Sequence, residues 1–291
     1  MAVNLSELCA TRAVLTDGAM GTELDARGLP AGMAHELWNI ENPQAVGKVH
    51  AAYAQGGSRI VLTNTFQANR IVLARHGLAK QTYDLNKAAV DIAAEAVGDD
   101  VLVFGSVGPT GKILLTGEIS EDEMLEVFAE QISALGQAGA KAIVLETFAD
   151  LDEAAIALKA AKDNCDLPVI VSFSFAAGAD HDRTIMGAGA KQIVEQLGAL
   201  EPAALGANCG VGPDVAVRLV ERYRKVWDGL VWIKPNAGVP QLIGGKTVFS
   251  SGPVEFASYV PALVEAGANF IGGCCGSRPE HIRAIAEILN G

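Results

Sequence analysis

The segment AIVLETFADLDEAAIALKAAKDNCDLPVIVSFSF, residues 142–175, holds two apolar runs separated by one amphipathic stretch. Neither run alternates cleanly between apolar and polar residues, which is typical of strands in a parallel sheet that is covered on both faces. Between the runs, Ala154, Leu158 and Ala161 recur at three- and four-residue steps, as in a helix with one apolar face. The segment therefore predicts a strand–helix–strand unit with parallel strands.

The same pattern recurs along the whole chain. Apolar runs followed by Ala-rich amphipathic stretches begin near Ala13, Arg59, Val101, Ala142, Pro168, Ala204, Val231 and Phe270. Their mean spacing of about 37 residues is enough for one strand, one helix and two loops in a right-handed crossover. This α/β pattern predicts a closed (β/α)8 barrel of the TIM type, as a single domain over residues 1–291. An open doubly wound sheet is the alternative, but the first run ends in DGAMGT, which lacks the GxGxxG spacing.

The composition limits the classes of function. The 291 residues include 22 Lys and Arg against 34 Asp and Glu, and this net charge of −12 disfavours nucleic-acid binding. No run approaches the roughly 18 apolar residues of a membrane span, and residues 1–12 lack a signal-peptide pattern. Five cysteines, with Cys274 and Cys275 adjacent, do not suit a disulfide framework. We therefore expect a cytoplasmic protein with reduced thiols and no nucleic-acid or membrane partner.

Three of the five cysteines fall where strands are expected to end, and in such a barrel these ends meet at one mouth that carries the catalytic groups. Cys209, Cys274 and Cys275 would together favour zinc and leave one tetrahedral position open. Adjacent residues of a regular strand point to opposite faces, but the glycines of GGCCG, residues 272–276, permit a turn that brings both sulfurs together. The alternative is that these cysteines are small buried hydrophobic residues.

Two short motifs carry a family resemblance. GANCG (206–210) and GGCCG (272–276) closely resemble the zinc signature of the homocysteine S-methyltransferase family. Further matches in family order are DGAMGTEL (17–24), TNTF (63–66), GSVGPTG (105–111), ETF (146–148) and KPNAG (234–238). GPTG and KPNAG are most similar to the homocysteine-binding module of cobalamin-dependent methionine synthase. The resemblance implies a barrel with zinc at its C-terminal mouth and a role in methionine biosynthesis.

The resemblance also implies a metal site. Cys209, Cys274 and Cys275 would be the catalytic residues that hold zinc, and the homocysteine sulfur would take the fourth position. The thiol would then react as a thiolate, whereas a free thiol with a pKa of about 8.5 is mostly protonated at neutral pH. Asn236 matches a family position near zinc and would occupy the open site before substrate arrives. On chemistry alone, Asn236 could equally be a structural loop residue.

The substrate's amino acid group would be bound beside the metal. The resemblance places Asp17 and Glu146 around the amino group of homocysteine, where charge-assisted hydrogen bonds would fix it. Their alternative roles are a turn-forming Asp and a Glu in the first turn of a helix. The substrate carboxylate would lie against a nest of backbone amides from Gly18, Ala19, Met20 and Gly21.

The methyl donor is less defined than the acceptor. The chain ends just after the eighth expected helix without a cobalamin domain, so we expect a methylcorrinoid such as methylcobalamin, carried by a separate corrinoid protein. S-methylmethionine or betaine is the alternative, but a small cation favours an aromatic cage. Aromatic residues make up only 5% of the chain, and Trp38 is the one cage candidate besides motif phenylalanines. Two other classes remain, a zinc hydrolase and a non-catalytic zinc-binding partner protein.

Residues outside the motifs receive structural expectations. The long insertion after the first run, residues 21–43, could form a lid over the mouth. His281 is expected at the surface of the last helix, and Cys9 and Cys165 are expected to take no part in the site.

Overall fold

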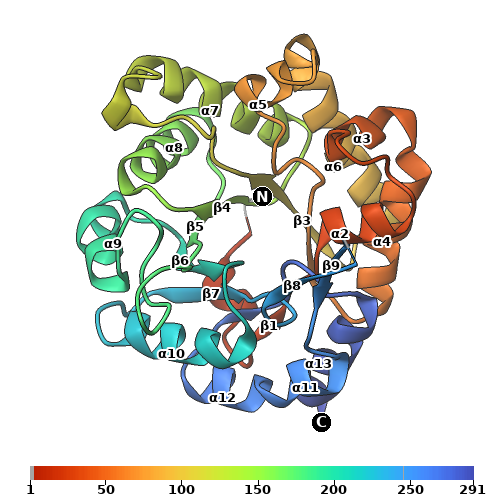
Figure 1. Cartoon of the computed structure of the whole chain (residues 1–291), viewed down its shortest axis with the longest axis vertical. Helices are drawn as coiled ribbons and strands as arrows, with labels where there is room; N and C mark the ends of the chain where they lie inside the picture. Colours follow the sequence, from red (N-terminus) through yellow and green to blue (C-terminus); the bar gives the residue numbers. More distant parts are fainter. Residues whose placement is uncertain (1–2, 245) are drawn as a thin grey trace.

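The computed structural model describes residues 3–244 and 246–291, and eight parallel strands occupy its centre (Figure 1). Their order in the sheet is β1-β10-β7-β6-β5-β4-β3-β2. The strands are β1 (Val14–Leu15), β2 (Ile60–Leu62), β3 (Leu102–Val107), β4 (Ile143–Phe148), β5 (Val169–Phe173), β6 (Ala204–Asn208), β7 (Leu230–Lys234) and β10 (Phe270–Ile271). At the junction of β1 and β2, the backbone N–H of Arg59 donates to the carbonyl of Leu15 at 2.8 Å. The sheet is therefore a nearly closed barrel, and the predicted fold is confirmed.

Helices surround the barrel on its outer side (Figure 1). Those that follow the eight strands are α4 (Pro43–Gln55), α6 (Thr82–Val97), α7 (Glu121–Gln137), α8 (Leu151–Asn164), α9 (Ala190–Leu197), α10 (Pro213–Arg224), α12 (Val260–Glu265) and α13 (Pro279–Asn290). Shorter helices are α1 (Leu5–Leu8), α2 (Met20–Ala26), η1 (His35–Leu37), α3 (Trp38–Glu41), α5 (Arg70–Ala74), η2 (Ala79–Gln81), η3 (Leu114–Thr116), η4 (Gly198–Leu200) and α11 (Pro253–Ser258). Within the described part of the chain, no helix has the length and apolar character needed to cross a membrane.

Helix α7 illustrates why these segments are helical. The side chain of Ser120 accepts a hydrogen bond from the backbone N–H of Glu123 at 3.2 Å and so caps the first turn. Phe128, Ile132 and Leu135 then follow at three- and four-residue steps and are all buried against the sheet. The periodic pattern therefore sets which face of the helix covers the barrel.

Alternate strand residues build two separate cores. Inside the barrel, Val144, Ile170 and Trp232 cluster with Leu5 of α1, so α1 covers the N-terminal end. Outward-facing neighbours such as Ile143 pack in the core between sheet and helices. This division follows from the two-residue period of a strand.

The barrel interior becomes polar toward the C-terminal end of the strands. In four strands, the residue two positions after a buried apolar residue is polar and also points inward. We call these four residues the polar layer: Ser106, Glu146, Ser172 and Lys234. These side chains follow Phe104, Val144, Ile170 and Trp232 respectively. A polar layer above an apolar plug creates a site for chemistry without opening a pore through the barrel.

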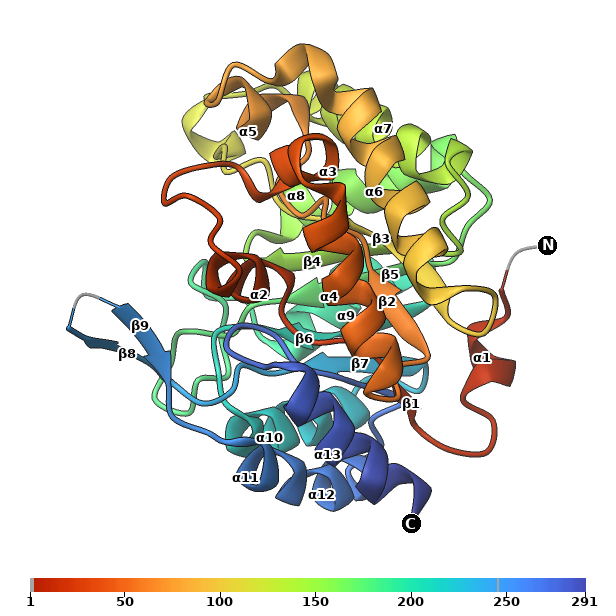
Figure 2. The ribbon, with the colours of Figure 1, turned by 90° about the vertical axis from the view of Figure 1, so that its right-hand side faces the viewer.

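The loops at the C-terminal mouth carry the additional structure. An antiparallel hairpin of β8 (Pro240–Ile243) and β9 (Lys246–Phe249) projects at the mouth, at the end opposite the N-terminus (Figure 2). The insertion expected as a lid, residues 21–43, contains most of α2 together with η1 and α3. His35 and Glu36 of this insertion line the cavity at the mouth, as a lid should.

His281 differs from its expected surface position. Its side chain is only 6% exposed, and its Nδ1 accepts a hydrogen bond from the backbone N–H of Arg278 at 3.1 Å. The other ring nitrogen lies 3.0 Å from the carbonyl of Ser251, and Phe256 packs against the ring edge to face. The expectation was wrong because this histidine serves as an N-terminal cap that ties α13 to the loop before α11.

Candidate active site

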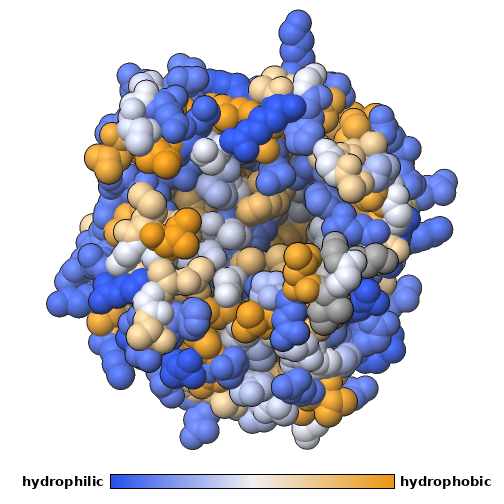
Figure 3. Space-filling view, viewed as in Figure 1, coloured by the Kyte–Doolittle hydropathy of each residue, from blue (hydrophilic) through white to orange (hydrophobic). Residues whose placement is uncertain are grey.

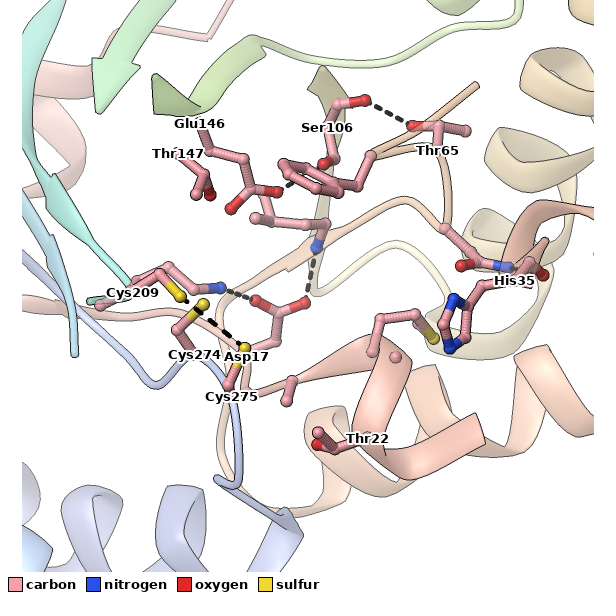
Figure 4. A pocket seen from close by; sticks show the side chains of 18 of the residues that line it. Asp17, Thr22, His35, Thr65, Ser106, Glu146, Thr147, Cys209, Cys274 and Cys275 are labelled. Atoms are coloured by element: carbon pink, nitrogen blue, oxygen red, sulfur yellow. Dashed lines mark hydrogen bonds and ion pairs between the residues drawn. The ribbon is translucent and has the colours of Figure 1, made fainter. Parts of the chain in front are cut away.

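Three thiols meet at the barrel mouth (Figure 4). The Sγ atoms of Cys209, Cys274 and Cys275 all lie within 4.8 Å of one another, and those of Cys209 and Cys275 are 3.8 Å apart. A tetrahedral zinc with Zn–S bonds of about 2.3 Å requires sulfur atoms about 3.8 Å apart. The sequence thus led to a cluster whose spacing can hold a metal ion. Cys9 and Cys165 lie apart from it and donate to backbone carbonyls of α1 and α8.

Tight turns bring the sulfurs together. Strand β6 ends at Asn208, and Cys209 and Gly210 then adopt left-handed backbone conformations with φ of 57° and 73°. On the other side, β10 ends at Ile271, so the adjacent cysteines lie in a turn and not in the strand. Gly276 closes this turn with a φ of 80°, a conformation that glycine adopts without strain.

Hydrogen bonds among the three thiols shift their pKa values in opposite directions. Hydrogen bonds with Cys274 and Cys275 lower the pKa of Cys209 to about 3. The same interactions with Cys209 raise the pKa of Cys274 and raise the pKa of Cys275 to about 12. The protein alone therefore stabilises a single thiolate here, and ionisation of all three thiols requires a bound cation.

Asn236 lies beside the cluster. Its side chain is buried and hydrogen-bonds to Cys209, which contributes to the low pKa of that thiol. The Oδ1 atom of Asn236 has no hydrogen-bond partner among the described residues. A buried unpaired carbonyl oxygen is costly, and coordination of a cation would satisfy it.

Glu146 reaches the same region from β4. The pairing of β4 with β5 shifts register between Leu145 and Phe148, and Thr147 has a φ of 65°. This bulge redirects the side chains at the strand end. The hydroxyl of Ser106 donates to Glu146 Oε1. Burial raises the pKa of Glu146, while the positive charge of Lys234 opposes this rise.

Asn208 connects Thr147, which follows Glu146, to the cysteine cluster. Its Oδ1 accepts from the backbone N–H of Thr147 at 2.9 Å and from the hydroxyl of Ser172 at 2.6 Å. Its Nδ2 donates to Thr147 Oγ1 at 2.7 Å and approaches Cys274 Sγ at 3.9 Å. One amide thereby supports both the strained residue that follows Glu146 and a cysteine of the cluster.

Asp17, at the end of β1, is already paired inside the protein. Lys234 donates to its Oδ1, and the backbone N–H of Leu62 donates to its Oδ2 at 2.7 Å. Burial raises the pKa of Asp17, whereas the lysine lowers it. Among the backbone N–H groups that were expected to form a nest, that of Ala19 donates a hydrogen bond to Ser277 Oγ at 3.2 Å. The other three residues, Gly18, Met20 and Gly21, line the cavity.

A cavity of about 360 Å³ connects these groups. Asp17, Glu146, Lys234 and the three cysteines line its base, and His35 and Glu36 line its outer part. The space-filling view shows the mouth face hollowed near its centre, with both polar and apolar residues around the hollow (Figure 3). Phe66 is the one aromatic residue besides His35 among the lining residues described. Trp38, expected as a cage candidate, is instead buried in the core.

Comparison with known proteins agrees with this geometry. The sequence pattern of the family described as homocysteine S-methyltransferase matches residues 14–289. The chain belongs to this family.

A solved relative within the homocysteine S-methyltransferase family is the homocysteine methyltransferase MmuM from Escherichia coli. Its metallated form has 26% sequence identity and a TM-score of 0.81, with 98% of this chain and 100% of that chain covered. A methyltransferase from Methanosarcina mazei has the same fold, with 13% identity, a TM-score of 0.65 and coverage of 98% and 96%. Dihydrodipicolinate synthase DapA-2 from Bacillus anthracis, with 13% identity, a TM-score of 0.55 and coverage of 96% and 74%, shares only the barrel architecture.

In this site, sequence reasoning missed the roles of Lys234 and Asn208. Both belong to motifs that were recognised, KPNAG and GANCG, but neither received a role. The available signal was their position at the end of a predicted strand, where side chains face the mouth. Lys234 directly follows the apolar run VWI, so its buried charge requires a buried partner.

Proposed function

We propose that the protein is a zinc-dependent homocysteine S-methyltransferase that forms methionine. The observation that carries this proposal is the group of three thiols at the mouth of a barrel of this family. Zinc bound there would present the homocysteine sulfur as a thiolate at neutral pH. In the transfer, a sulfur–carbon bond forms, the bond between the methyl group and its carrier breaks, and the carrier keeps the electron pair.

The chain's own residues have separate tasks in this proposal. Cys209, Cys274 and Cys275 would hold the metal, and Asn236 would offer its side-chain oxygen to the metal when no substrate is bound. Their sulfur spacing, together with the unpaired oxygen of Asn236, supports these assignments. The E. coli relative is known in a metallated form, which supports a metal in this protein as well.

The amino acid part of homocysteine would be held beside the cysteines, at the base of the same cavity. Glu146 and Asp17 bind the ammonium group, because both are buried carboxylates in the cavity that also contains the thiols. The backbone at Gly18, Met20 and Gly21 faces the same cavity and is suited to the substrate carboxylate. The ammonium position thereby orients the sulfur toward the metal.

We further propose that a methylcorrinoid on a partner protein is the donor. Phe66 is the one phenylalanine, tyrosine or tryptophan among the described lining residues, so the cavity offers no aromatic cage for a small cation. Exposed apolar side chains on the mouth loops, among them Leu115 and Leu242, suit contact with a second protein.

One observation favours a small sulfonium or betaine donor instead. Glu36 is buried in the outer part of the cavity, and its Oε2 has no hydrogen-bond partner among the described residues. Such a carboxylate could attract a cationic methyl donor entering from the mouth.

A donor panel tests the proposal. Zinc-loaded protein is incubated with homocysteine and, in turn, methylcobalamin, a methylated corrinoid protein, S-methylmethionine, S-adenosylmethionine, betaine or methyltetrahydrofolate, and methionine is measured. We expect turnover with the corrinoids and none after zinc is removed by a chelator. Turnover with S-methylmethionine alone would replace the corrinoid proposal by the sulfonium alternative. Absence of methionine with every donor, with zinc bound, would favour a non-catalytic zinc protein.

A further inference from the structure

Lys234 is the most deeply buried cation at the mouth among the described residues. It ends β7, is only 2% exposed, and lines the cavity with its ammonium group. Its Nζ lies 5.8 Å from the centre of the Trp232 ring, which belongs to the apolar plug below. Lysine is almost never buried to this degree without a partner, so this position requires an explanation.

The partner of Lys234 is Asp17, and the pair spans three strands. Lys234 from β7 holds Oδ1 of Asp17, and the backbone N–H of Leu62 from β2 holds Oδ2 at 2.7 Å. The carboxylate at the end of β1 is therefore fixed from two sides. Rotation of Asp17 would break both contacts: loss of the first would leave two buried charges without a partner, and loss of the second would leave the buried N–H of Leu62 without an acceptor.

Lys234 also sets the balance of charge at the base of the cavity. Two carboxylates, Asp17 and Glu146, and one ammonium, Lys234, line the base of the cavity. With both carboxyls ionised, Asp17, Glu146 and Lys234 together carry one excess negative charge. One further ammonium neutralises it, whereas without Lys234 two buried carboxylates would repel each other with no internal cation.

We propose that Lys234 is a positioning residue that sets specificity for an acceptor with one ammonium group. It holds Asp17 in the orientation in which both carboxylates receive the ammonium of the substrate. This inference rests on the proposed function and extends it, because it explains why a buried lysine lies beside a site for a cationic group. Lys234 contacts Asp17, and Asp17 contacts the substrate in this proposal. Lys234 therefore acts through Asp17.

The test compares two thiols that differ only in the amino group. Binding of homocysteine and of 4-mercaptobutanoate, which lacks the ammonium, is measured by calorimetry on zinc-loaded wild type and Lys234→Met. We expect the Kd of homocysteine to rise about tenfold, the effect of losing one charge-assisted hydrogen bond. The Kd of 4-mercaptobutanoate should change by less than about twofold, because that ligand makes no ammonium contact.

Two further variants separate this role from a structural one. Asp17→Asn combined with Lys234→Met removes both charges of the pair, so it should fold even where the single variant does not. It should lose about as much homocysteine affinity as Lys234→Met alone, because both changes remove the same oriented acceptor. Lys159→Met removes an exposed ion pair with Asp163 and should leave both affinities unchanged.

The outcomes distinguish the two levels of the proposal. A loss of affinity that is equal for both thiols, or absent for both, would overturn the specificity role of Lys234 and leave the proposed function intact. Failure of the zinc-loaded wild type to bind homocysteine would instead overturn the proposed function together with this inference. A selective loss for homocysteine in Lys234→Met supports both.

Discussion

At the scale of single residues, the cysteine cluster is a device for concentrating negative charge. Hydrogen bonds among the thiols lower the pKa of Cys209 and raise the pKa values of Cys274 and Cys275. A divalent cation compensates the repulsion among three thiolates, so metal binding and loss of the two protons are coupled. The cluster is therefore expected to bind metal more weakly at low pH, where protons compete for the sulfurs.

Substitution of single cysteines tests the metal site directly. We expect one zinc per chain in the wild type and a large loss of zinc in Cys209→Ser, Cys274→Ser and Cys275→Ser, because a hydroxyl is a poor substitute for a thiolate ligand. Metal content is measured by atomic emission on purified protein. Cys9→Ser and Cys165→Ser serve as matched controls and should keep zinc. Full zinc retention in any of the first three variants would exclude that residue as a ligand.

Glu146 carries a separate prediction about the substrate. Glu146→Gln keeps the size and the acceptor for Ser106 but removes the charge, so the KM for homocysteine should rise roughly 10- to 150-fold. Zinc content should remain that of the wild type, because Glu146 is no metal ligand. The exposed Glu195→Gln is the control. An unchanged KM with intact zinc would show that Glu146 has a structural role only.

The candidate site could be predicted from the sequence where residue type alone specifies the chemistry. The cysteine group followed from three thiols at expected strand ends, and family motifs added Asp17 and Glu146. The role of Lys234 could not be read in this way, because its partner Asp17 lies 217 residues away and the pair forms only when β1 and β7 share one barrel. Local patterns contain no information on such pairing of charges.

At the scale of elements, the turn after β10 determines where two of the sulfurs lie. A side chain on Gly276 would need a strained backbone, with φ of 80°, and its Cβ would meet the Phe249 ring at 2.2 Å. Phe249 ends the hairpin strand β9, so the hairpin packs against the cysteine turn. Hairpin position and metal site are therefore coupled through this glycine.

Gly276→Ala tests this coupling against a matched glycine. Gly28 also has a positive φ, 94°, but a Cβ there would meet no atom within 4 Å. Gly28→Ala should lower the free energy of unfolding by about 1–2 kcal/mol, the cost of the left-handed backbone alone. Gly276→Ala should cost about 1–3 kcal/mol more through overpacking, and should also weaken zinc binding. Equal stability losses with unchanged zinc affinity in both variants would contradict the coupling.

Helix α4 contains a histidine whose burial makes stability depend on pH. Burial lowers the pKa of His50 to about 4, and neither ring nitrogen has a hydrogen-bond partner among the described residues. Between this value and the ordinary pKa of about 6.5, the unfolded chain binds a proton at His50 that the folded chain does not. Stability is therefore lost as the pH falls through this window, by about 2–3 kcal/mol between pH 7 and pH 4.5.

His50→Leu should remove this part of the acid sensitivity. Urea unfolding of metal-free wild type and variant at pH 7 and pH 4.5 gives the loss of unfolding free energy for each protein. We expect the loss to be smaller in the variant by about 2–3 kcal/mol, because leucine cannot be protonated. Equal losses in the two proteins would show that His50 is protonated in the folded state.

The sequence predicted the elements unevenly. All eight barrel strands lie at the expected apolar runs, because burial on both faces leaves a continuous apolar signal. The β8–β9 hairpin was not expected, since it buries little of its surface and Val239, Leu242 and Val248 are exposed. His281 was misplaced because one of the two backbone groups that pair with its ring, the carbonyl of Ser251, comes from a loop 30 residues earlier.

At the scale of the whole molecule, the polarity of the side chains changes along the barrel axis. The N-terminal end is closed by α1 and an apolar plug, the middle is polar and charged, and the mouth loops expose large apolar side chains. Exposed apolar side chains on the mouth loops include Ile113, Leu115, Ile185, Met186, Val239, Leu242 and Val248. The cavity and these exposed apolar side chains therefore lie at the same end of the barrel.

The proposed partner protein makes this gradient testable. Leu115 and Leu242 are 89% and 78% exposed on two different mouth loops, whereas Val226 is 37% exposed just after α10, at the opposite end of the barrel. If a corrinoid protein docks on the mouth, Leu115→Glu and Leu242→Glu place a charge in the contact and should lower kcat/KM for that protein about tenfold. Turnover of free methylcobalamin, which needs no protein contact, should stay unchanged, and Val226→Glu should affect neither donor. Equal loss with both donors would show that the loops act on the cavity itself, and unchanged kinetics with the corrinoid protein would show that it docks elsewhere.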